Sequence, residues 1–321
     1  MDQGPAAGQS AAATAHRPPR PLLGAALVMG AASLWATFGI FAKHLYDAGF
    51  EPLELASVRA AVGFAAIAVI ALVRGGAGVV VGWRALPFLA AYGILGYALF
   101  TLVFFRALGA NTVSVAVALL YTAPAFVLLM SAILWRERVG ALRLVALALV
   151  LCGVVLVTGA AGALLQGTAV LPPLALALGI ASGLTYAIYT MFSSVSTMRY
   201  GPTASLFWSF GFATLVFALI VPPHTPFMRI PGHLPALLAL GIVPTLIPYA
   251  LFLAALRDLK ASTASMLASI EPVVAATLAA LLLHERMDLL QGAGVLLVVA
   301  AAALLARQVA RPADPEVSAT C

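Results

Sequence analysis

The sequence predicts an all-α polytopic membrane protein, in which ten transmembrane helices form two inverted five-helix repeats around a central cavity. Three observations predict this fold class: the composition, a regular series of apolar runs, and a duplicated segment. Of the 321 residues, 63% are hydrophobic and 9% are charged, whereas about a quarter of the residues of a soluble domain are charged. The mean hydropathy is +1.08. The solvent of this chain is therefore predicted to be lipid.

Ten apolar runs each come close to the ~20 residues with which a helix crosses a hydrocarbon core of ~30 Å. In the first half they cover roughly residues 22 to 43, 53 to 73, 85 to 106, 113 to 134 and 142 to 160. The second half follows with roughly 171 to 192, 202 to 222, 233 to 256, 262 to 283 and 289 to 307.

A segment of the first half recurs in the second half without a gap. Pro124 precedes Glu137-Arg138 as Pro272 precedes Glu285-Arg286, and the two segments are 148 residues apart. The prediction is one repeat over residues 22–160 and a second over 171–307. Since five is an odd number of spans, the two repeats would have opposite orientations and a pseudo-two-fold axis in the membrane plane, an arrangement typical of alternating-access transporters.

The distribution of Lys and Arg predicts the orientation. A polar N-terminal tail, residues 1–21, and a C-terminal tail, residues 308–321, are expected to be cytoplasmic, and the first tail is expected to be disordered. With the termini inside, the inner loops and tails receive twelve basic residues and the outer loops four, as the positive-inside rule requires. The predicted location is the cytoplasmic (inner) membrane. The bias towards the inner leaflet accounts for the net charge of +6, so no nucleic-acid partner is expected.

Glu271 is the main candidate for chemistry. It lies near the middle of the ninth apolar run, where a bare carboxylate costs on the order of 3 kcal/mol, so it should face protein or a water-filled cavity. Pro272 cannot donate a helical hydrogen bond and should kink the helix, as should Pro124 in the other repeat. Two interpretations stay open. Glu271 carries a coupling proton, or it stabilises the backbone at the Pro272 kink.

Arg59 and the aromatic residues inside the spans are the candidates for substrate contact. Arg59 could attract a substrate carboxylate, pair with Glu54 one turn earlier, or extend to the interface. The aromatic side chains need partners for their polar tips, which lipid does not provide and a cavity would. They could also hold apolar or cationic groups. The predicted cavity residues of this kind are Trp35, Tyr97, Tyr121, Tyr186 and Tyr249.

Several other classes of protein fit the sequence less well. The two cysteines, Cys152 and Cys321, imply no disulfide framework, and no cofactor or metal motif is recognised. An intramembrane enzyme would need a nucleophile–base pair or paired acids, whereas Glu271 is the only carboxylate predicted at mid-depth. A channel would need a ring of like charges or a carbonyl-lined filter. Both remain alternatives to a transporter.

The chain resembles the EamA family of the drug/metabolite transporter superfamily. The resemblance is carried by the Pro-x12-Glu-Arg run, the Gln291-Gly292-Ala293-Gly294 segment, Glu271-Pro272 and Arg59. The resemblance covers about residues 22 to 307. Within the family, the chain is similar to ten-span bacterial amino-acid exporters. The resemblance implies export of a small metabolite, with an amino acid as the first expectation and lipophilic drugs as the alternative. A single copy is expected to suffice for transport.

Overall fold

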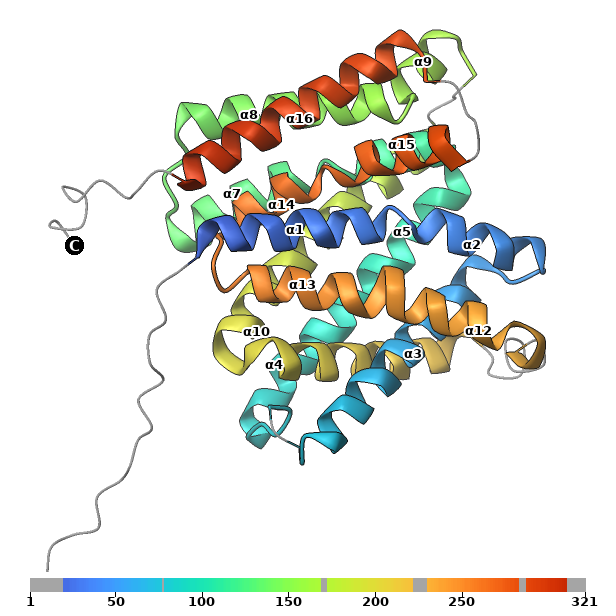
Figure 1. Ribbon diagram of the computed structural model, residues 1–321, viewed down its shortest axis with the longest axis vertical. Coiled ribbons are helices and arrows are strands. Elements are labelled where there is room, and N and C mark those ends of the chain that lie inside the picture. Colours follow the sequence, from blue (N-terminus) through green and yellow to red (C-terminus); the bar gives the residue numbers. More distant parts are fainter. Residues whose placement is uncertain (1–19, 77, 169–171, 222–229, 283–286, 311–321) are drawn as a thin grey trace, which may run out of the picture.

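The computed structural model describes residues 20–76, 78–168, 172–221, 230–282 and 287–310, and the regular elements in these ranges are all helices (Figure 1). The first part of the chain forms α1 (Pro21–Trp35), α2 (Phe38–Asp47), α3 (Pro52–Val73), η1 (Trp83–Ala85), α4 (Leu86–Ala91), η2 (Tyr92–Ala98), α5 (Leu99–Ala110), α6 (Val113–Leu120), α7 (Ala123–Trp135), α8 (Ala141–Val157) and α9 (Ala160–Leu165). The second part forms α10 (Pro173–Ile220), α12 (Ile230–Gly241), η3 (Ile242–Leu246), α13 (Ile247–Ala255), α14 (Ala261–Ala268), α15 (Glu271–Leu282) and α16 (Leu289–Ala310).

Eight helical stretches among the described residues are long and apolar enough to cross a membrane, which confirms the all-α, multi-pass class. They cover Pro21–Asp47, Pro52–Val73, Trp83–Ala110, Val113–Trp135, Pro173–Ile220, Pro231–Ala255, Ala261–Leu282 and Leu289–Gln308. The sequence predicted ten spans. The difference arises at two places, α8 and α10.

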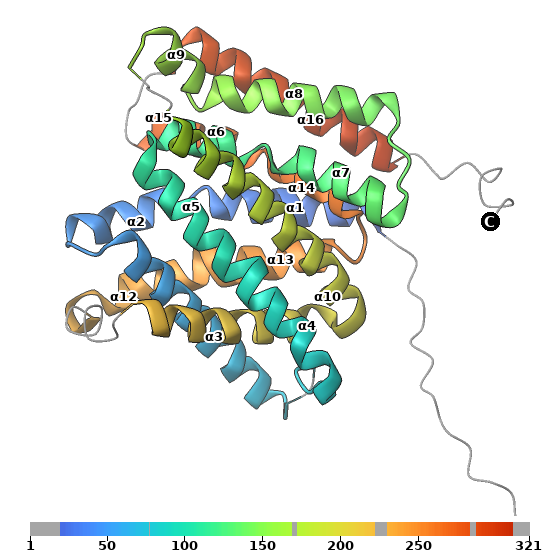
Figure 2. The same cartoon turned by 180° about the vertical axis from the view of Figure 1, so that it is seen from behind.

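Helix α8 has 17 residues and is shorter than the ~20 residues of a typical span. Helix α10 has 48 residues, so a straight helix of that length would be about 72 Å long, more than twice the hydrocarbon thickness. It is not straight. Gly201 has φ 80° and ψ 163° and precedes Pro202, so the helix turns there, and its two arms run in different directions (Figure 2).

The predicted proline kinks are complete helix breaks. Tyr121 and Thr122 separate α6 from α7, and 148 positions later Ser269 and Ile270 separate α14 from α15. Pro124 and Pro272 each lie in the first turn of the following helix, where a proline removes no intrahelical hydrogen bond.

Two wide helical turns end 148 positions apart. The π-helix η2 covers Tyr92–Ala98 and the π-helix η3 covers Ile242–Leu246. Short π-helical segments are rare and often lie at functional sites. The irregularities of the two halves thus occur at matching positions.

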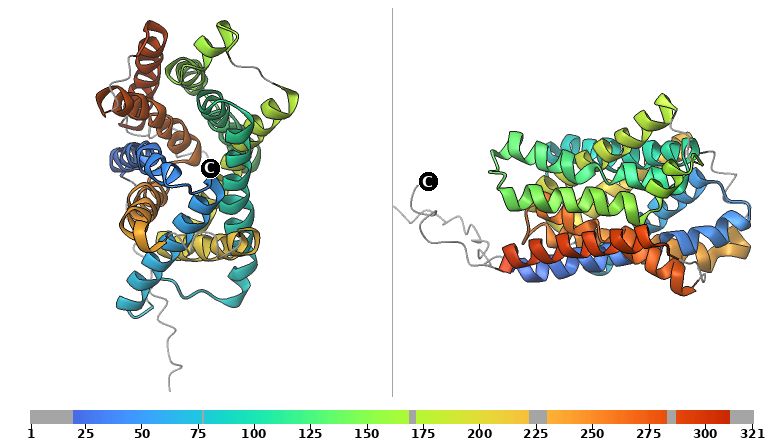
Figure 3. Two further views of the ribbon diagram at one scale, coloured as in Figure 1. Left: turned by 90° about the vertical axis from the view of Figure 1, so that its right-hand side faces the viewer. Right: turned by 90° about the horizontal axis from the view of Figure 1, so that it is seen from above.

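Helices α8 and α16 pack against each other at the outer edge of the bundle (Figures 1 and 3). Small residues allow a close approach. A Cβ at Gly294 would overlap the backbone nitrogen of Val157 and lie 2.7 Å from the carbonyl oxygen of Gly153. Helix α1 begins and α16 ends at the same end of the bundle (Figure 1).

The α6–α7 break rests on a glycine of α10. A Cβ at Gly183 would overlap Oγ1 of Thr122 and lie 3.0 Å from the carbonyl oxygen of Leu120. We therefore expect Gly183→Ala to destabilise the protein by about 1–3 kcal/mol, the usual cost of overpacking. The measurement is thermal unfolding in detergent. Gly109→Ala is the matched control, because a Cβ there has no neighbour within 4 Å. An unchanged melting temperature for Gly183→Ala would contradict the described packing.

Candidate functional site

A cavity of about 110 Å³ lies between the two halves of the bundle. Aromatic side chains make up most of its wall, together with one basic and one acidic residue. The lining consists of Trp35, Phe38, Arg59, Phe100, Thr101, Phe104, Phe105, Val117, Leu120, Tyr121, Tyr186, Tyr249 and Glu271. Its volume is several times the space that one water molecule needs.

The cavity leads to one end of the bundle. A second pocket of about 530 Å³ shares Trp35, Tyr121 and Glu271 with the first and extends along α2 to Lys43 and Asp47. Lys43 and Asp47 form an ion pair there, and each of the two side chains is 67% exposed. We call this pocket the outer cavity and this end of the bundle the open end. The opposite end, where α1 begins, is called the closed end.

Glu271 and Tyr121 meet where the two broken helices face each other. The Tyr121 hydroxyl donates a hydrogen bond to Oε2 of Glu271 at 2.7 Å, and the two residues are 150 positions apart in the chain. Glu271 is the first residue of α15, so its carboxylate also interacts favourably with the positive end of the helix dipole. A separation of 2.7 Å is usual for an O–H···O hydrogen bond.

Arg59 reaches the same cavity from α3. Its Nε donates to Oγ1 of Thr245 in η3 at 3.1 Å, and its guanidinium lies 4.8 Å from the centre of the Phe38 ring. The Glu54 carboxylate accepts from the backbone nitrogen of Glu51 in a capping box at the start of α3. The polar end of Arg59 is thus held at the cavity wall by a hydrogen bond from the other half of the chain.

Six of the seven predicted site residues line this one cavity: Trp35, Arg59, Tyr121, Tyr186, Tyr249 and Glu271. Tyr97 does not. It is 1% exposed and lies behind the wall, where its ring is 5.2 Å from that of Tyr249 and 5.1 Å from that of Phe210. Trp35 lies 5.2 Å from Tyr249 and Phe100 lies 5.2 Å from Tyr186. The buried Tyr189 connects the two pairs, at 5.6 Å from Tyr249 and 6.0 Å from Tyr186.

The sequence did not single out the phenylalanines of the wall or Thr101. Thr101 lies one turn after Tyr97 on α5 and donates to its carbonyl oxygen at 2.8 Å. Its position one helical turn after Tyr97, a predicted site residue, was the feature of the sequence from which Thr101 could have been predicted. Among the described residues no group of three or more His, Cys, Asp or Glu side chains could hold a metal ion. The charged residues of the cavity lining are Arg59 and Glu271.

Comparison with known proteins identifies the family of the chain. The model of the EamA-like transporter family matches residues 22–159 and 173–307. An uncharacterized transporter of Archaeoglobus fulgidus is 30% identical over 277 residues, which cover 86% of this chain and 94% of that protein. A second uncharacterized transporter of the same organism is 32% identical over 154 residues, 47% of this chain and 51% of that protein.

A solved crystal structure shows the same fold. It superposes with a TM-score of 0.71 at 19% identity and covers 90% of this chain and 99% of that one. The family match extends over both halves of the chain, and the apolar helices of the structure fit it. The chain therefore belongs to the EamA-like transporter family, within the drug/metabolite transporter superfamily, and is a multi-pass membrane transporter.

Proposed function

We propose that the protein exports small zwitterionic metabolites, most simply amino acids with an apolar side chain, and that a proton carried by Glu271 drives the export. One observation carries the proposal: Arg59 and Glu271 line the same aromatic cavity. A guanidinium matches the carboxylate of a zwitterion. The Glu271 carboxylate matches its ammonium group.

The aromatic wall supports an apolar substrate side chain. Tyr186, Tyr249 and Trp35 offer ring faces for stacking, and an ammonium group near such a face gains a cation–π attraction. Size supports a small substrate, because 110 Å³ is well below the roughly 300–1,000 Å³ of sites for drug-sized ligands. The cavity thus favours a compact molecule with both charges close together.

The outer cavity favours the second candidate, efflux of lipophilic compounds. Its volume of about 530 Å³ falls in the range for drug-sized ligands. In this alternative the substrate stays near Trp35 and Tyr121 and does not require Arg59. The two candidates differ in their dependence on the charge of the substrate.

The proposed mechanism is alternating access by two inverted five-helix repeats. It counts α8 as the fifth span and the two arms of α10 as the sixth and seventh, so that the spans number ten. The helix breaks at 121–122 and 269–270, and the π-helices η2 and η3, support the duplication because they recur at matching positions. Both termini face the cytoplasm in this proposal, which agrees with α1 beginning and α16 ending at one end and with the excess of Arg and Lys predicted there.

A counterflow screen in proteoliposomes tests the function. Vesicles loaded with unlabelled amino acids, cationic drugs or sugar phosphates are diluted into trace labelled compound, and the transient uptake is measured. We expect uptake with zwitterionic amino acids and none with sugar phosphates, which carry no ammonium group. Uptake of lipophilic drugs alone would favour the second candidate. A flux far above about 10³ molecules per second would indicate a channel.

Tyr186 is expected to contact the substrate. Removing its ring by Tyr186→Ala should lower the apparent affinity in counterflow by roughly tenfold, because stacking and cation–π contacts are each worth about 1 kcal/mol. Tyr200→Ala is the matched control: Tyr200 lies on the same arm of α10 but outside the cavity, where its ring is 6.1 Å from Phe88. Equal effects of both changes would assign Tyr186 to helix packing.

A further inference from the structure

The closed end of the bundle contains a second set of polar contacts, which the proposed substrate site does not use. At this end the backbone nitrogen of Arg20 donates to Oδ1 of Asp258 at 2.9 Å, so the start of α1 lies beside the connection between α13 and α14. The two pockets described above include no residue of α14. In this region α14 packs against α7 and α10, and neither of those two pockets extends between α7 and α14.

The repeat relation indicates where a path could form. Under the proposed inverted duplication, the wall of the outer cavity has an equivalent 148 positions away in the chain. The equivalents of Phe104, Val117, Tyr121 and Pro272 are Phe252, Ser265, Ser269 and Pro124, and all four equivalents are buried. The surface that would line an inward-facing cavity is thus present and closed.

Helix α14 has the composition of a cavity wall. All eight of its residues are buried, among them Ser262, Thr263 and Ser265. Ser265 is 1% exposed, and its hydroxyl has no hydrogen-bond partner among the described residues. A buried polar atom without a partner is costly and needs an explanation. Contact with water in another conformation provides one.

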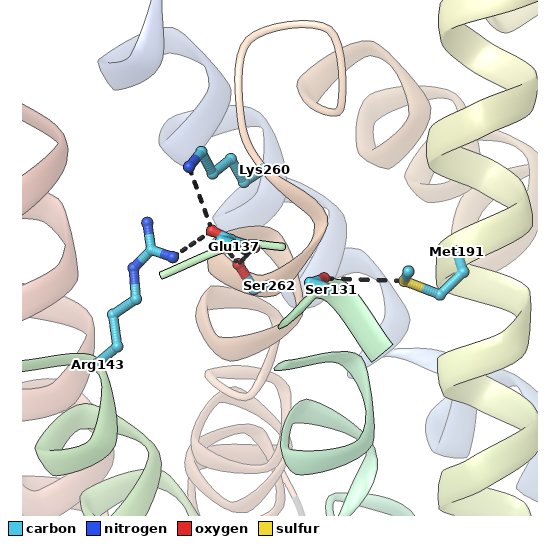
Figure 4. A network of polar contacts seen from close by, with 6 residues as sticks. All are labelled: Ser131, Glu137, Arg143, Met191, Lys260 and Ser262. Carbon is cyan, nitrogen blue, oxygen red and sulfur yellow. Dashed lines mark hydrogen bonds and ion pairs between the residues drawn. The ribbon is translucent and has the colours of Figure 1, made fainter. Parts of the chain in front are cut away.

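Glu137 holds this region together (Figure 4). Its side chain is 5% exposed and forms an ion pair with Arg143, in the first turn of α8. From the other half of the chain, Ser262 in the first turn of α14 donates to its two carboxylate oxygens at 3.1 and 3.2 Å. Lys260 approaches Oε1 to 3.4 Å. A single carboxylate thus connects the end of α7 with the start of α14.

A second contact joins α7 to the first arm of α10. The Ser131 hydroxyl on α7 is 3.9 Å from the sulfur of Met191 on the first arm of α10 (Figure 4). Ser131 is completely buried. Separation of α7 from α14 and α10 would break both contacts and would expose Ser265.

We propose that Glu137 is the latch of the closed end, and that its release from Ser262 and Lys260 opens an inward-facing cavity between α7, the first arm of α10 and α14. The proposal rests on the transport function above and adds the residue that controls access from the second side. While the latch is closed, the cavity communicates with the open end only. The polar face of α14 becomes the wall of the path once α7 has moved away.

Cysteine accessibility tests the latch without any substrate. In a chain carrying Cys152→Ala and Cys321→Ala, a cysteine is introduced at Ser265, and a membrane-impermeant maleimide is applied from the closed end. We expect slow labelling in the parent and about tenfold faster labelling after Glu137→Gln, since hydrogen bonds to a charged group shift an equilibrium by about that factor or more. Ser262→Ala, which removes a single donor, should give a smaller increase in the same direction.

The open end should respond in the opposite sense. A cysteine at Gly39, which lines the outer cavity, should be labelled more slowly from that end after Glu137→Gln, because opening of one end is coupled to closure of the other. Asp288→Asn is the matched control. It neutralises an exposed carboxylate at the start of α16 that lines neither cavity, and it should leave the labelling of Ser265→Cys unchanged.

The outcome separates the latch from the transport function. If Glu137→Gln and Ser262→Ala both remain monodisperse and neither accelerates labelling of Ser265→Cys, the latch is wrong, whatever the protein transports. If labelling accelerates but counterflow fails with every compound, the latch stands and the proposed function falls. If Glu137→Gln does not fold, the labelling of Ser265→Cys in the Ser262→Ala variant tests the latch instead.

Discussion

Glu271→Gln is expected to abolish the accumulation of substrate against its gradient, while counterflow persists at saturating substrate. The apparent affinity for zwitterions should fall by roughly tenfold or more, because their ammonium group loses its carboxylate partner. Gln keeps the length of the side chain and can still accept the hydrogen bond that the Tyr121 hydroxyl donates at 2.7 Å, so the cavity keeps its shape. The amide cannot bind or release a proton. Counterflow needs only movement of the loaded protein between its two states, whereas accumulation needs the proton to move with each cycle.

Proteoliposomes with an imposed pH gradient provide the measurement. Asp288→Asn is the matched control, because Asp288 lies far from the cavity, at the start of α16, where it accepts from the backbone nitrogen of Gln291, and Asn can accept the same bond. Accumulation by Glu271→Gln with the pH dependence of the parent would show that Glu271 stabilises the break before α15 and that the protein uses another ion or none.

Arg59→Gln is expected to lower the apparent affinity for zwitterionic substrates by roughly 10- to 100-fold, since a hydrogen bond to a charged group is worth about 1.5–3 kcal/mol. The loss should be specific to the carboxylate. An amine analogue without the carboxylate should bind weakly to the parent and be almost unaffected by the substitution. Competition in the counterflow assay measures both affinities.

Arg106→Gln is the control for a general effect of charge, because Arg106 lies on the exposed side of α5 and does not line the cavity. Arg59→Lys adds a second comparison. It keeps the charge but has no group equivalent to Nε, which donates to Thr245 at 3.1 Å, and should fall between the parent and Gln. An equal loss for the amine analogue and the zwitterion would place Arg59 in the packing of the wall.

The sequence predicted the class of fold and six of the thirteen residues that line the cavity, because lipid penalises polar groups strongly. Arg59, Glu271 and Tyr186 stand out in apolar runs, and they line one cavity for the reason that made them conspicuous: each polar tip avoids lipid. Tyr97 is equally conspicuous but lies behind the wall. Tyr97 lies within η2, a π-helical turn whose wider hydrogen-bond spacing shifts its residues from the faces of a regular α-helix, and no sequence pattern predicts that turn.

The boundaries of the spans were harder to predict for local reasons. The predicted spans 171–192 and 202–222 are separated by a short polar segment, residues 193–201, yet the structure stays helical through this segment up to Gly201. The break between α1 and α2 at Ala36 and Thr37 has no proline or glycine to signal it. By contrast, Pro124 and Pro272 marked the other two breaks correctly, since a proline within an apolar run has few positions that it can occupy.

The contact of α8 with α16 has a consequence for the cohesion of the bundle. Lipid tails are as apolar as leucine, so ordinary apolar contacts between membrane helices gain little over contacts with lipid, and adhesion depends on backbones that approach closely. Gly153 and Gly294 provide such an approach at the outer edge of the bundle, where α8 and α16 pack behind Tyr121. The two halves are thus joined firmly at this edge. The walls around Glu271 and Arg59 can separate during a transport cycle without any tendency of the halves to dissociate.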